Sequence, residues 1–102
     1  SLAMLLRLVG HDARALADPA AALVAITADP PDAAVLDLRM PGMTGFELAR
    51  RVRAAVGPAV RLVAVSGERA VDPKALAAAG FDAHLVKPAD PTALLAAVAP
   101  RL

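Results

Sequence analysis

Three polar residues in this sequence each end a short apolar run, and their types suit one kind of chemistry. Asp37 ends Ala-Ala-Val-Leu-Asp, Ser66 ends Leu-Val-Ala-Val-Ser, and Lys87 ends His-Leu-Val-Lys. A carboxylate can attack a phosphoryl group and form an aspartyl phosphate. A hydroxyl and an ammonium group can then hold the phosphoryl oxygens and offset their charge. The three residues predict a phosphoryl-transfer site if the fold brings them together.

The apolar runs before these residues are nearly continuous, which is typical of parallel strands covered on both faces. We expect buried strands at Ala34–Leu38, Arg61–Val65 and Ala83–Val86, with a weaker strand at His11–Ala17. Alanine- and leucine-rich helical stretches alternate with these strands. Asp-Pro pairs mark helix starts and glycines mark helix ends. The pairs are Asp18-Pro19, Asp72-Pro73 and Asp90-Pro91, and the glycines are Gly10, Gly57 and Gly80.

This alternation of helices and strands predicts an α/β three-layer sandwich with a parallel sheet. The sequence has no internal repeat and no linker, so we interpret residues 1–102 as one domain. In an open parallel sheet, the carboxyl ends of the strands form the ligand crevice. We therefore expect Asp37, Ser66 and Lys87 to meet at one rim, although they come from well-separated parts of the chain.

The composition excludes several other classes of protein. Hydrophobic residues make up 58% and charged residues 21%, which fits a compact globular domain. Aromatic residues make up only 2%, too few for a platform that stacks single-stranded nucleic acid. The absence of cysteine excludes disulfides, thiolate metal sites and cysteine nucleophiles. The sequence shows no membrane-spanning run and no signal peptide, so we expect a cytoplasmic protein.

The net charge of the chain is +1, and its basic residues are scattered. The densest group is Arg50, Arg51 and Arg53, whose spacing places them on the outer face of one predicted helix. We interpret this group as a solvated helix face, because a surface that tracks phosphates usually needs a larger basic patch. We expect no direct nucleic-acid partner and no membrane partner.

Three motifs together resemble bacterial two-component receiver domains, which belong to response regulators and hybrid histidine kinases. Val35–Gly45, with the sequence Val-Leu-Asp-Leu-Arg-Met-Pro-Gly-Met-Thr-Gly, resembles the phosphoacceptor segment of that family. Val63–Gly67 resembles its switch strand, and Leu85–Pro88 resembles its lysine–proline turn. The resemblance covers essentially all 102 residues, with the motifs in family order. It implies a flavodoxin-like fold.

The resemblance also implies roles for individual residues. Asp37 matches the phosphorylated aspartate, Ser66 the switch hydroxyl that turns toward the phosphoryl group, and Lys87 the lysine that pairs with that group. The bond from Lys87 to Pro88 is cis in the family, and proline lowers the cost of a cis bond. Gly67 matches a small residue that leaves room for a phosphodonor.

A second switch residue and a magnesium site follow from the same resemblance. His84 matches a rotating aromatic position that reports phosphorylation, although it could equally be a half-buried strand histidine without a switching role. Mg²⁺ would be held by Asp37 and by the backbone carbonyl of Arg39. Pro41, Gly42 and Gly45 are expected to shape the loop into the next helix, whose core face carries Leu48, Ala49, Val52 and Val56.

One part of the family pattern is missing from this sequence. The family begins with a strand that ends in two or three acidic residues, which bind Mg²⁺ beside the phosphoacceptor. This chain starts in an apolar helical pattern, so we interpret it as lacking the first strand and the acidic pair. Asp12 begins the weak strand, and Asp29 and Asp32 precede the strand that ends at Asp37, which places all three at the opposite edge of the sheet. We therefore expect an incomplete magnesium site.

The favoured function is that of a phosphoacceptor in a two-component phosphorelay, with a histidine kinase or histidine phosphotransfer protein as partner. Such a domain is not an enzyme in the usual sense. The alternative is a non-phosphorylated pseudo-receiver that acts as a protein-interaction module, which the missing acidic pair favours. A dehalogenase-type phosphatase also uses a strand-end aspartate, but it needs a second acid two residues later, and here Arg39 stands there.

The missing strand leads to a prediction about stability. In the family it lies inside the sheet, in the order 2-1-3-4-5, so its loss exposes the edges of its neighbours or forces them together. Unpaired apolar edges favour association with another chain. We expect this 102-residue chain by itself to be poorly stable or self-associated. Sedimentation and thermal melting test this, and a cooperatively melting monomer would contradict it.

Overall fold

The computed structural model describes residues 13–14, 19–38, 43–67, 71–87 and 90–98. The strands are β1 (Ala13–Arg14), β2 (Ala33–Asp37), β3 (Arg61–Ser66) and β4 (Ala83–Val86). The helices are α2 (Pro19–Ala28), α3 (Gly45–Val56), α4 (Pro73–Ala79) and α5 (Pro91–Val98), with a short 3₁₀ turn, η1 (Gly57–Ala59). The helix expected at the start of the chain lies outside the described residues.

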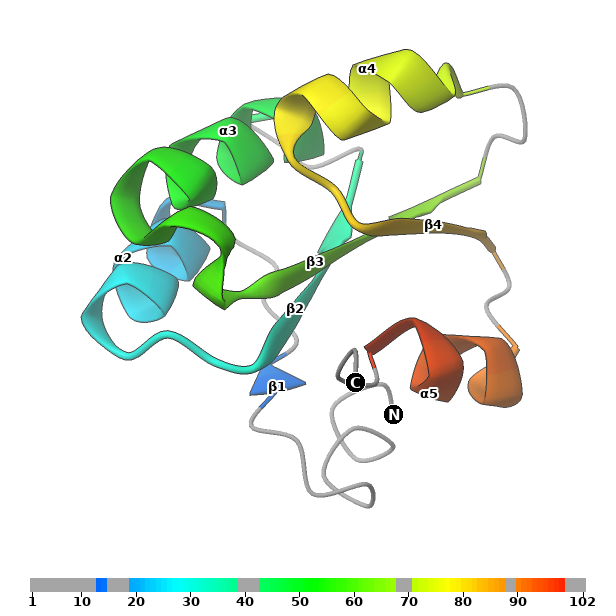
Figure 1. Cartoon of the computed structure of the whole chain (residues 1–102), viewed down its shortest axis with the longest axis horizontal. Helices are drawn as coiled ribbons and strands as arrows, with labels where there is room; N and C mark the ends of the chain where they lie inside the picture. The colour runs from blue at the N-terminus through cyan, green and yellow to red at the C-terminus, as the bar shows by residue number, and fades with distance from the viewer. Residues whose placement is uncertain (1–12, 15–18, 39–42, 68–70, 88–89, 99–102) are drawn as a thin grey trace.

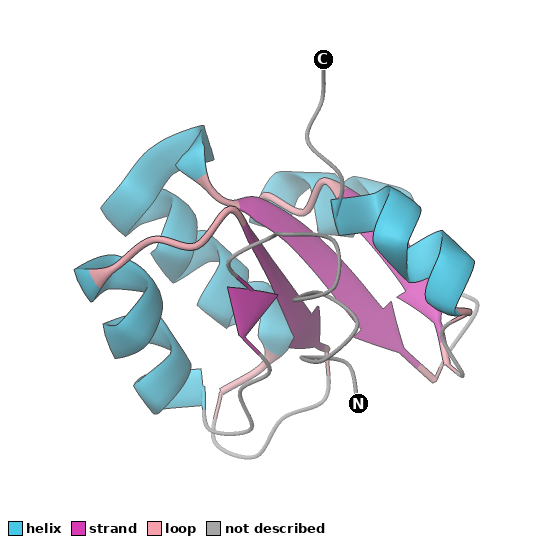
Figure 2. Cartoon of the chain, turned by 90° about the horizontal axis from the view of Figure 1, so that it is seen from below, coloured by secondary structure: helices cyan, strands magenta, loops and turns pink. Residues whose placement is uncertain are grey.

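The four strands form one parallel sheet in the order β1-β2-β3-β4. Helices α2, α3 and α4 cover one face of this sheet, and α5 covers the other (Figure 1). Figure 2, in which the molecule is seen from below, shows the strands with helices on both sides of them. The predicted α/β three-layer sandwich is confirmed. In the described part of the chain β1 pairs directly with β2, through Ala13 with Ala33 and Arg14 with Ala34.

Alternate strand residues enter two separate cores, one on each face of the sheet. On the face covered by α3, the buried residues include Ala34 and Leu36 of β2 and Leu48 and Val52 of the helix. On the face covered by α5, they include Val35, Val63, Val65, Ala97 and Val98. Successive side chains of a strand point to opposite faces of the sheet. When helices cover both faces, the side chains on each face must be apolar. This explains why the strand sequences do not alternate with polar residues.

The predicted strands differ from the observed ones by about one residue at their ends. Of the weak first strand expected at His11–Ala17, the structure describes Ala13–Arg14, and both residues are in β1. Two predicted helix boundaries are well defined. The Asp72 side chain accepts a hydrogen bond from the Lys74 amide at the start of α4, and Pro73 follows the cap. Gly80 ends α4 with a φ of 103°, a conformation that favours glycine. Asp18 and Gly10 lie outside the described residues.

The interpretation of Arg53 as part of a solvated helix face is wrong. Its side chain is only 21% exposed, and its guanidinium group donates to the carbonyls of Gly57, Val60 and Gly80 at 2.6–2.9 Å. It also binds the Asp82 carboxylate at 2.8 Å. These groups surround the end of α3, the end of α4 and the start of β4. Arg53 therefore joins three elements, and a carbonyl left without it would lack a donor.

Replacement of Arg53 by alanine is expected to lower the free energy of unfolding by about 2–4 kcal/mol, because it leaves partly buried carbonyls and a carboxylate without their donor. Arg51 in the same helix makes only an exposed ion pair with Glu47 at 3.0 Å. Arg51→Ala, the matched control, is expected to change stability by less than about 1 kcal/mol. Urea unfolding measures the free energy of unfolding of both variants. An equal loss of stability in the two would contradict the role of Arg53 in joining the three elements.

No helix within the described ranges is long and apolar enough to cross a membrane.

Candidate functional site

The structure brings the three predicted site residues to one edge of the sheet. Asp37 is the last residue of β2, Ser66 is the last residue of β3, and Lys87 directly follows β4. Because these strands are neighbours and parallel, their carboxyl ends lie together. The Lys87 amide donates to the Ser66 carbonyl at 2.7 Å, which fixes the backbone of the two strand ends against each other.

An ion pair joins the two charged members of this site. The Lys87 ammonium group donates to Oδ2 of Asp37, across fifty residues of sequence. The two side chains are 50% and 35% exposed, respectively. A carboxylate at this exposure can be reached by a reactant from solvent. An ammonium group bound to it supplies positive charge where the oxygens of an incoming anionic group would lie.

The hydroxyl of Ser66 has a different environment. Ser66 is 4% exposed, and its Oγ lies 2.8 Å from Nε2 of the half-buried His84. Sequence reasoning assigned both residues to switching but did not predict this contact. The strand register holds the signal for it. In the strand register, Ala64 pairs with His84 and Ser66 pairs with Val86. Because Ser66 follows Ala64 by two residues, its side chain lies on the same face of the sheet as that of His84.

Glycine is required where α3 begins beside the site. Gly45 is the first residue of α3, next to the helix cap Thr44, rather than part of the preceding loop as we expected. A Cβ atom at Gly45 would lie 2.6 Å from the carbonyl oxygen of Asp37 and 2.8 Å from Cα of Leu38. Both are backbone atoms that cannot turn aside. The close approach holds the helix start against the end of β2.

The described residues do not form a magnesium site by themselves. Mg²⁺ prefers near-octahedral coordination by oxygen, usually with one or two carboxylates. Asp37 is the acidic side chain that ends a strand at this edge, and no cluster of three metal-ligating side chains occurs in the described ranges. Asp32 precedes β2 and lies at the opposite edge, as predicted. Arg39 and Asp12 lie outside the described residues.

This parallel α/β sheet, with an aspartate, a serine and a lysine at its carboxyl edge, has the arrangement expected of a receiver domain, and comparisons with known proteins agree with this class. The family described as the response regulator receiver domain matches residues 1–99. The chain belongs to this family.

Individual relatives and solved structures give the same result. The chain is 37% identical over 102 residues to the DNA-binding response regulator MtrA of Mycobacterium tuberculosis, covering 99% of this chain and 44% of the relative. A putative response regulator from Chloroflexus aurantiacus is 30% identical, with a TM-score of 0.80 over 95% of this chain and 81% of the other. The receiver domain of the sensor histidine kinase PA1611 of Pseudomonas aeruginosa, with magnesium in its active site cleft, is 26% identical, with a TM-score of 0.78 over 93% and 80%.

These comparisons bear on the expected partners. The chain spans less than half the length of the curated relatives that it matches. Those relatives are named as DNA-binding response regulators, so our expectation of no nucleic-acid partner is not supported. One of the solved structures is itself the receiver domain of a sensor histidine kinase, and a kinase partner for this chain stays a proposal.

Two glycines near the site are predicted to respond differently to substitution. Gly45→Ala is expected to cost about 1–3 kcal/mol of unfolding free energy, because the added methyl group meets backbone atoms. Gly67→Ala is the matched control, since a Cβ atom there meets nothing within 4 Å. It is expected to change stability by less than about 1 kcal/mol. Denaturant unfolding compares the two, and a tolerated Gly45→Ala would contradict the close packing of α3 on β2.

Proposed function

We propose that this chain accepts a phosphoryl group on Asp37 from a histidine kinase or a histidine phosphotransfer protein, within a two-component phosphorelay. The observation that carries the proposal is the ion pair between Asp37 and Lys87 at the open carboxyl edge of the sheet, beside Ser66. Membership of the receiver family supports it. The domain spans residues 1–102, acts in the cytoplasm, and is a signalling module rather than an enzyme with its own turnover.

The proposed step is an in-line displacement at phosphorus. An oxygen of the Asp37 carboxylate forms the new O–P bond, and the P–N bond of a phosphohistidine donor breaks. The imidazole of the donor leaves with the electron pair of that bond and takes up a proton. Lys87 moves from the carboxylate to the phosphoryl oxygens, which keeps its positive charge next to the negative charge. The Ser66 hydroxyl donates a hydrogen bond to a phosphoryl oxygen.

Magnesium dependence is a separate part of the proposal. Asp37, together with the carbonyl of Arg39, would supply ligands from this chain, and further oxygen ligands would be needed to complete the coordination. We therefore assign no step of the reaction to the metal. Phosphorylation assays with Mg²⁺ and with a chelator measure how far the reaction depends on it.

The central test is phosphorylation by a small acyl phosphate, followed by mass spectrometry of the intact chain. We expect the added mass of one phosphoryl group in the unmodified chain and none in Asp37→Asn, which has no carboxylate to attack phosphorus. Asp32→Asn is the matched control, because Asp32 is exposed at the opposite end of the same strand. Unmodified protein after prolonged incubation with Mg²⁺ would contradict the proposal and favour the pseudo-receiver.

Lys87 provides a second test of the same site. Lys87→Ala leaves the nucleophile intact but removes the positive charge that binds Asp37. We expect phosphorylation of this variant to slow by about tenfold or more, since one charge-assisted hydrogen bond to a phosphoryl oxygen is worth about 1.5–3 kcal/mol. Lys74→Ala is the control, because Lys74 is an exposed lysine on α4. Equal rates for the two variants would exclude Lys87 from the site.

A further inference from the structure

Helix α2 is apolar on its exposed side as well as on its buried side. Its sequence, Pro-Ala-Ala-Ala-Leu-Val-Ala-Ile-Thr-Ala, contains no charged residue. Ala22 and Ile26 are buried in the core. Val24, midway between them in sequence, is 69% exposed and is the one large hydrophobic residue that is exposed in the described ranges. With Val24, the exposed residues of the helix form what we call the outer face of α2: Ala20, Ala21, Thr27 and Ala28.

The one polar side chain on this outer face has its hydrogen-bond partner inside the helix. The Thr27 hydroxyl donates to the carbonyl of Leu23 at 2.7 Å, one turn earlier. A hydroxyl has a single hydrogen to donate, so this bond uses it. The outer face therefore presents mainly hydrocarbon to the solvent.

The neighbouring helix α3 has the composition that is usual for a surface helix. It packs beside α2 on the same face of the sheet (Figure 1). Its exposed side carries Arg50 and Arg51, and Arg51 forms an ion pair with Glu47. A surface helix normally has charged and polar residues away from the core, whereas a helix that is apolar all round is normally buried. The outer face of α2 thus has the composition of a covered surface.

We propose that a second copy of this chain covers the outer face of α2, with the two α2 helices packed antiparallel about a twofold axis at Val24. This axis places Val24 opposite its own copy. Ala20 then lies opposite Ala28 of the second copy, and Ala21 lies opposite Thr27. The small side chains beside each valine let the two helices approach closely. A twofold contact of this kind uses the same surface on both copies, and the inference does not depend on phosphorylation.

The distribution of charge favours a second copy and an antiparallel direction. The outer face carries no charge, so two copies meet without repulsion and bury no unpaired ion. The start of a helix has a partial positive charge and its end a partial negative charge. Antiparallel packing sets each start beside the other helix's end, where the exposed Asp29 adds negative charge. Parallel packing would instead bring the two Asp29 side chains together, which is unfavourable.

The length of α2 limits the strength of the contact. Its ten residues span about 15 Å. A pair of helices of this length buries less than the roughly 1,200 Å² that is typical of a stable complex. We therefore expect a weak dimer whose mean mass in sedimentation equilibrium rises between about 10 µM and about 1 mM chain.

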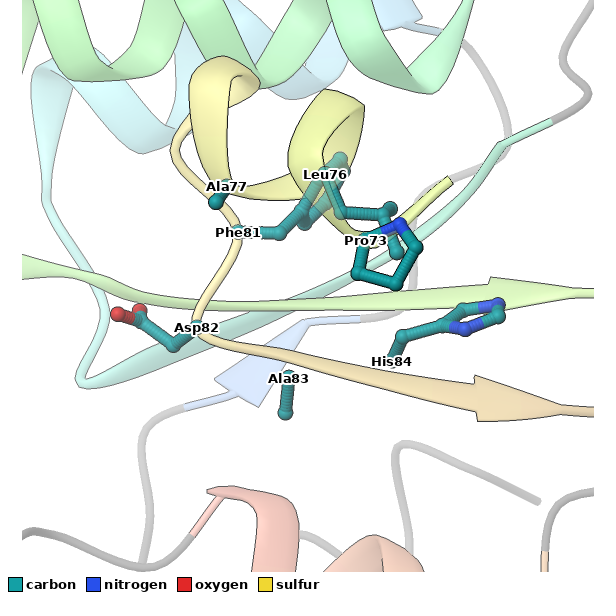
Figure 3. A pocket seen from close by; sticks show the side chains of 7 residues that line it. All are labelled: Pro73, Leu76, Ala77, Phe81, Asp82, Ala83 and His84. Carbon is teal, nitrogen blue, oxygen red and sulfur yellow. The ribbon is translucent and has the colours of Figure 1, made fainter. Parts of the chain in front are cut away.

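A second apolar depression on the surface serves as a comparison. A pocket of about 240 Å³ lies between α4 and β4 and includes Pro73, Leu76 and Phe81 in its lining (Figure 3). Ala77, an exposed residue of α4, also lines it. Helix α3 lies between α2 and α4 on this face of the sheet (Figure 1). Association through the pocket therefore involves a different part of the molecule from association through α2.

The first experiment is disulfide crosslinking of single-cysteine variants of the full chain by copper phenanthroline. The chain has no cysteine, so each introduced thiol reports on one position. We expect Val24→Cys to give at least about fivefold more covalent dimer than the controls, because a disulfide needs Cα atoms within about 7 Å of each other. The controls are Ala54→Cys, exposed on α3, and Ala77→Cys, at the pocket. Equal yields, or a higher yield from Ala77→Cys, would overturn the proposal.

The second experiment measures the mass of Val24→Asp by sedimentation equilibrium over the same concentrations. We expect this variant to stay a monomer, because the contact would bury two carboxylates against each other. Ala54→Asp is the matched control and is expected to associate like the unmodified chain, since Ala54 is exposed on α3. Circular dichroism checks that both variants keep their helices. An unmodified chain that stays monomeric, or association that persists in Val24→Asp through strand edges or another surface, would overturn the proposal.

Discussion

Parallel hydrogen bonding between β2, β3 and β4 places the last residues of all three strands at one edge of the sheet. Each strand end then presents one polar side chain: a carboxylate, a hydroxyl and an ammonium group. The ion pair between Asp37 and Lys87 forms because two distant segments end side by side. If the strands slipped by one residue, these side chains would point to the opposite face of the sheet. The chemistry of the site thus depends on the strand register.

Packing on both faces holds that register. The residues of β2 and β3 enter one core with α3 and another with α5, so a slip would carry apolar side chains out of both. Two local contacts fix the positions of the helices relative to the strands. Arg53 ties the end of α3 to Gly80 and Asp82 at the start of β4, and Gly45 lets α3 approach the backbone of Asp37 closely. Both lie outside the site, yet both determine where its side chains can be.

The chain belongs to the receiver family, so the residues at its functional edge can be compared with the pattern of that family. At the functional edge the described residues include Asp37, Ser66 and Lys87, and no group of three metal-ligating side chains occurs in the described ranges. Lys87 forms an ion pair with Asp37 and offsets its negative charge. The hydroxyl oxygen of Ser66 lies 2.8 Å from Nε2 of His84.

Local patterns in the sequence predicted the element types, the order of the strands along the chain, and Asp37, Ser66 and Lys87 as the residues that end or directly follow neighbouring strands. These follow from hydrophobic runs, Asp-Pro caps and glycine stops, all of which act over a few residues. The tertiary structure alone decided the partner of Arg53, the need for glycine at Gly45, and the Ser66–His84 contact. Each of these depends on distances between segments remote in sequence. Residue spacing on one helix predicted a solvated Arg53. This prediction was wrong because spacing gives no information about the carbonyl groups that other elements place next to the side chain.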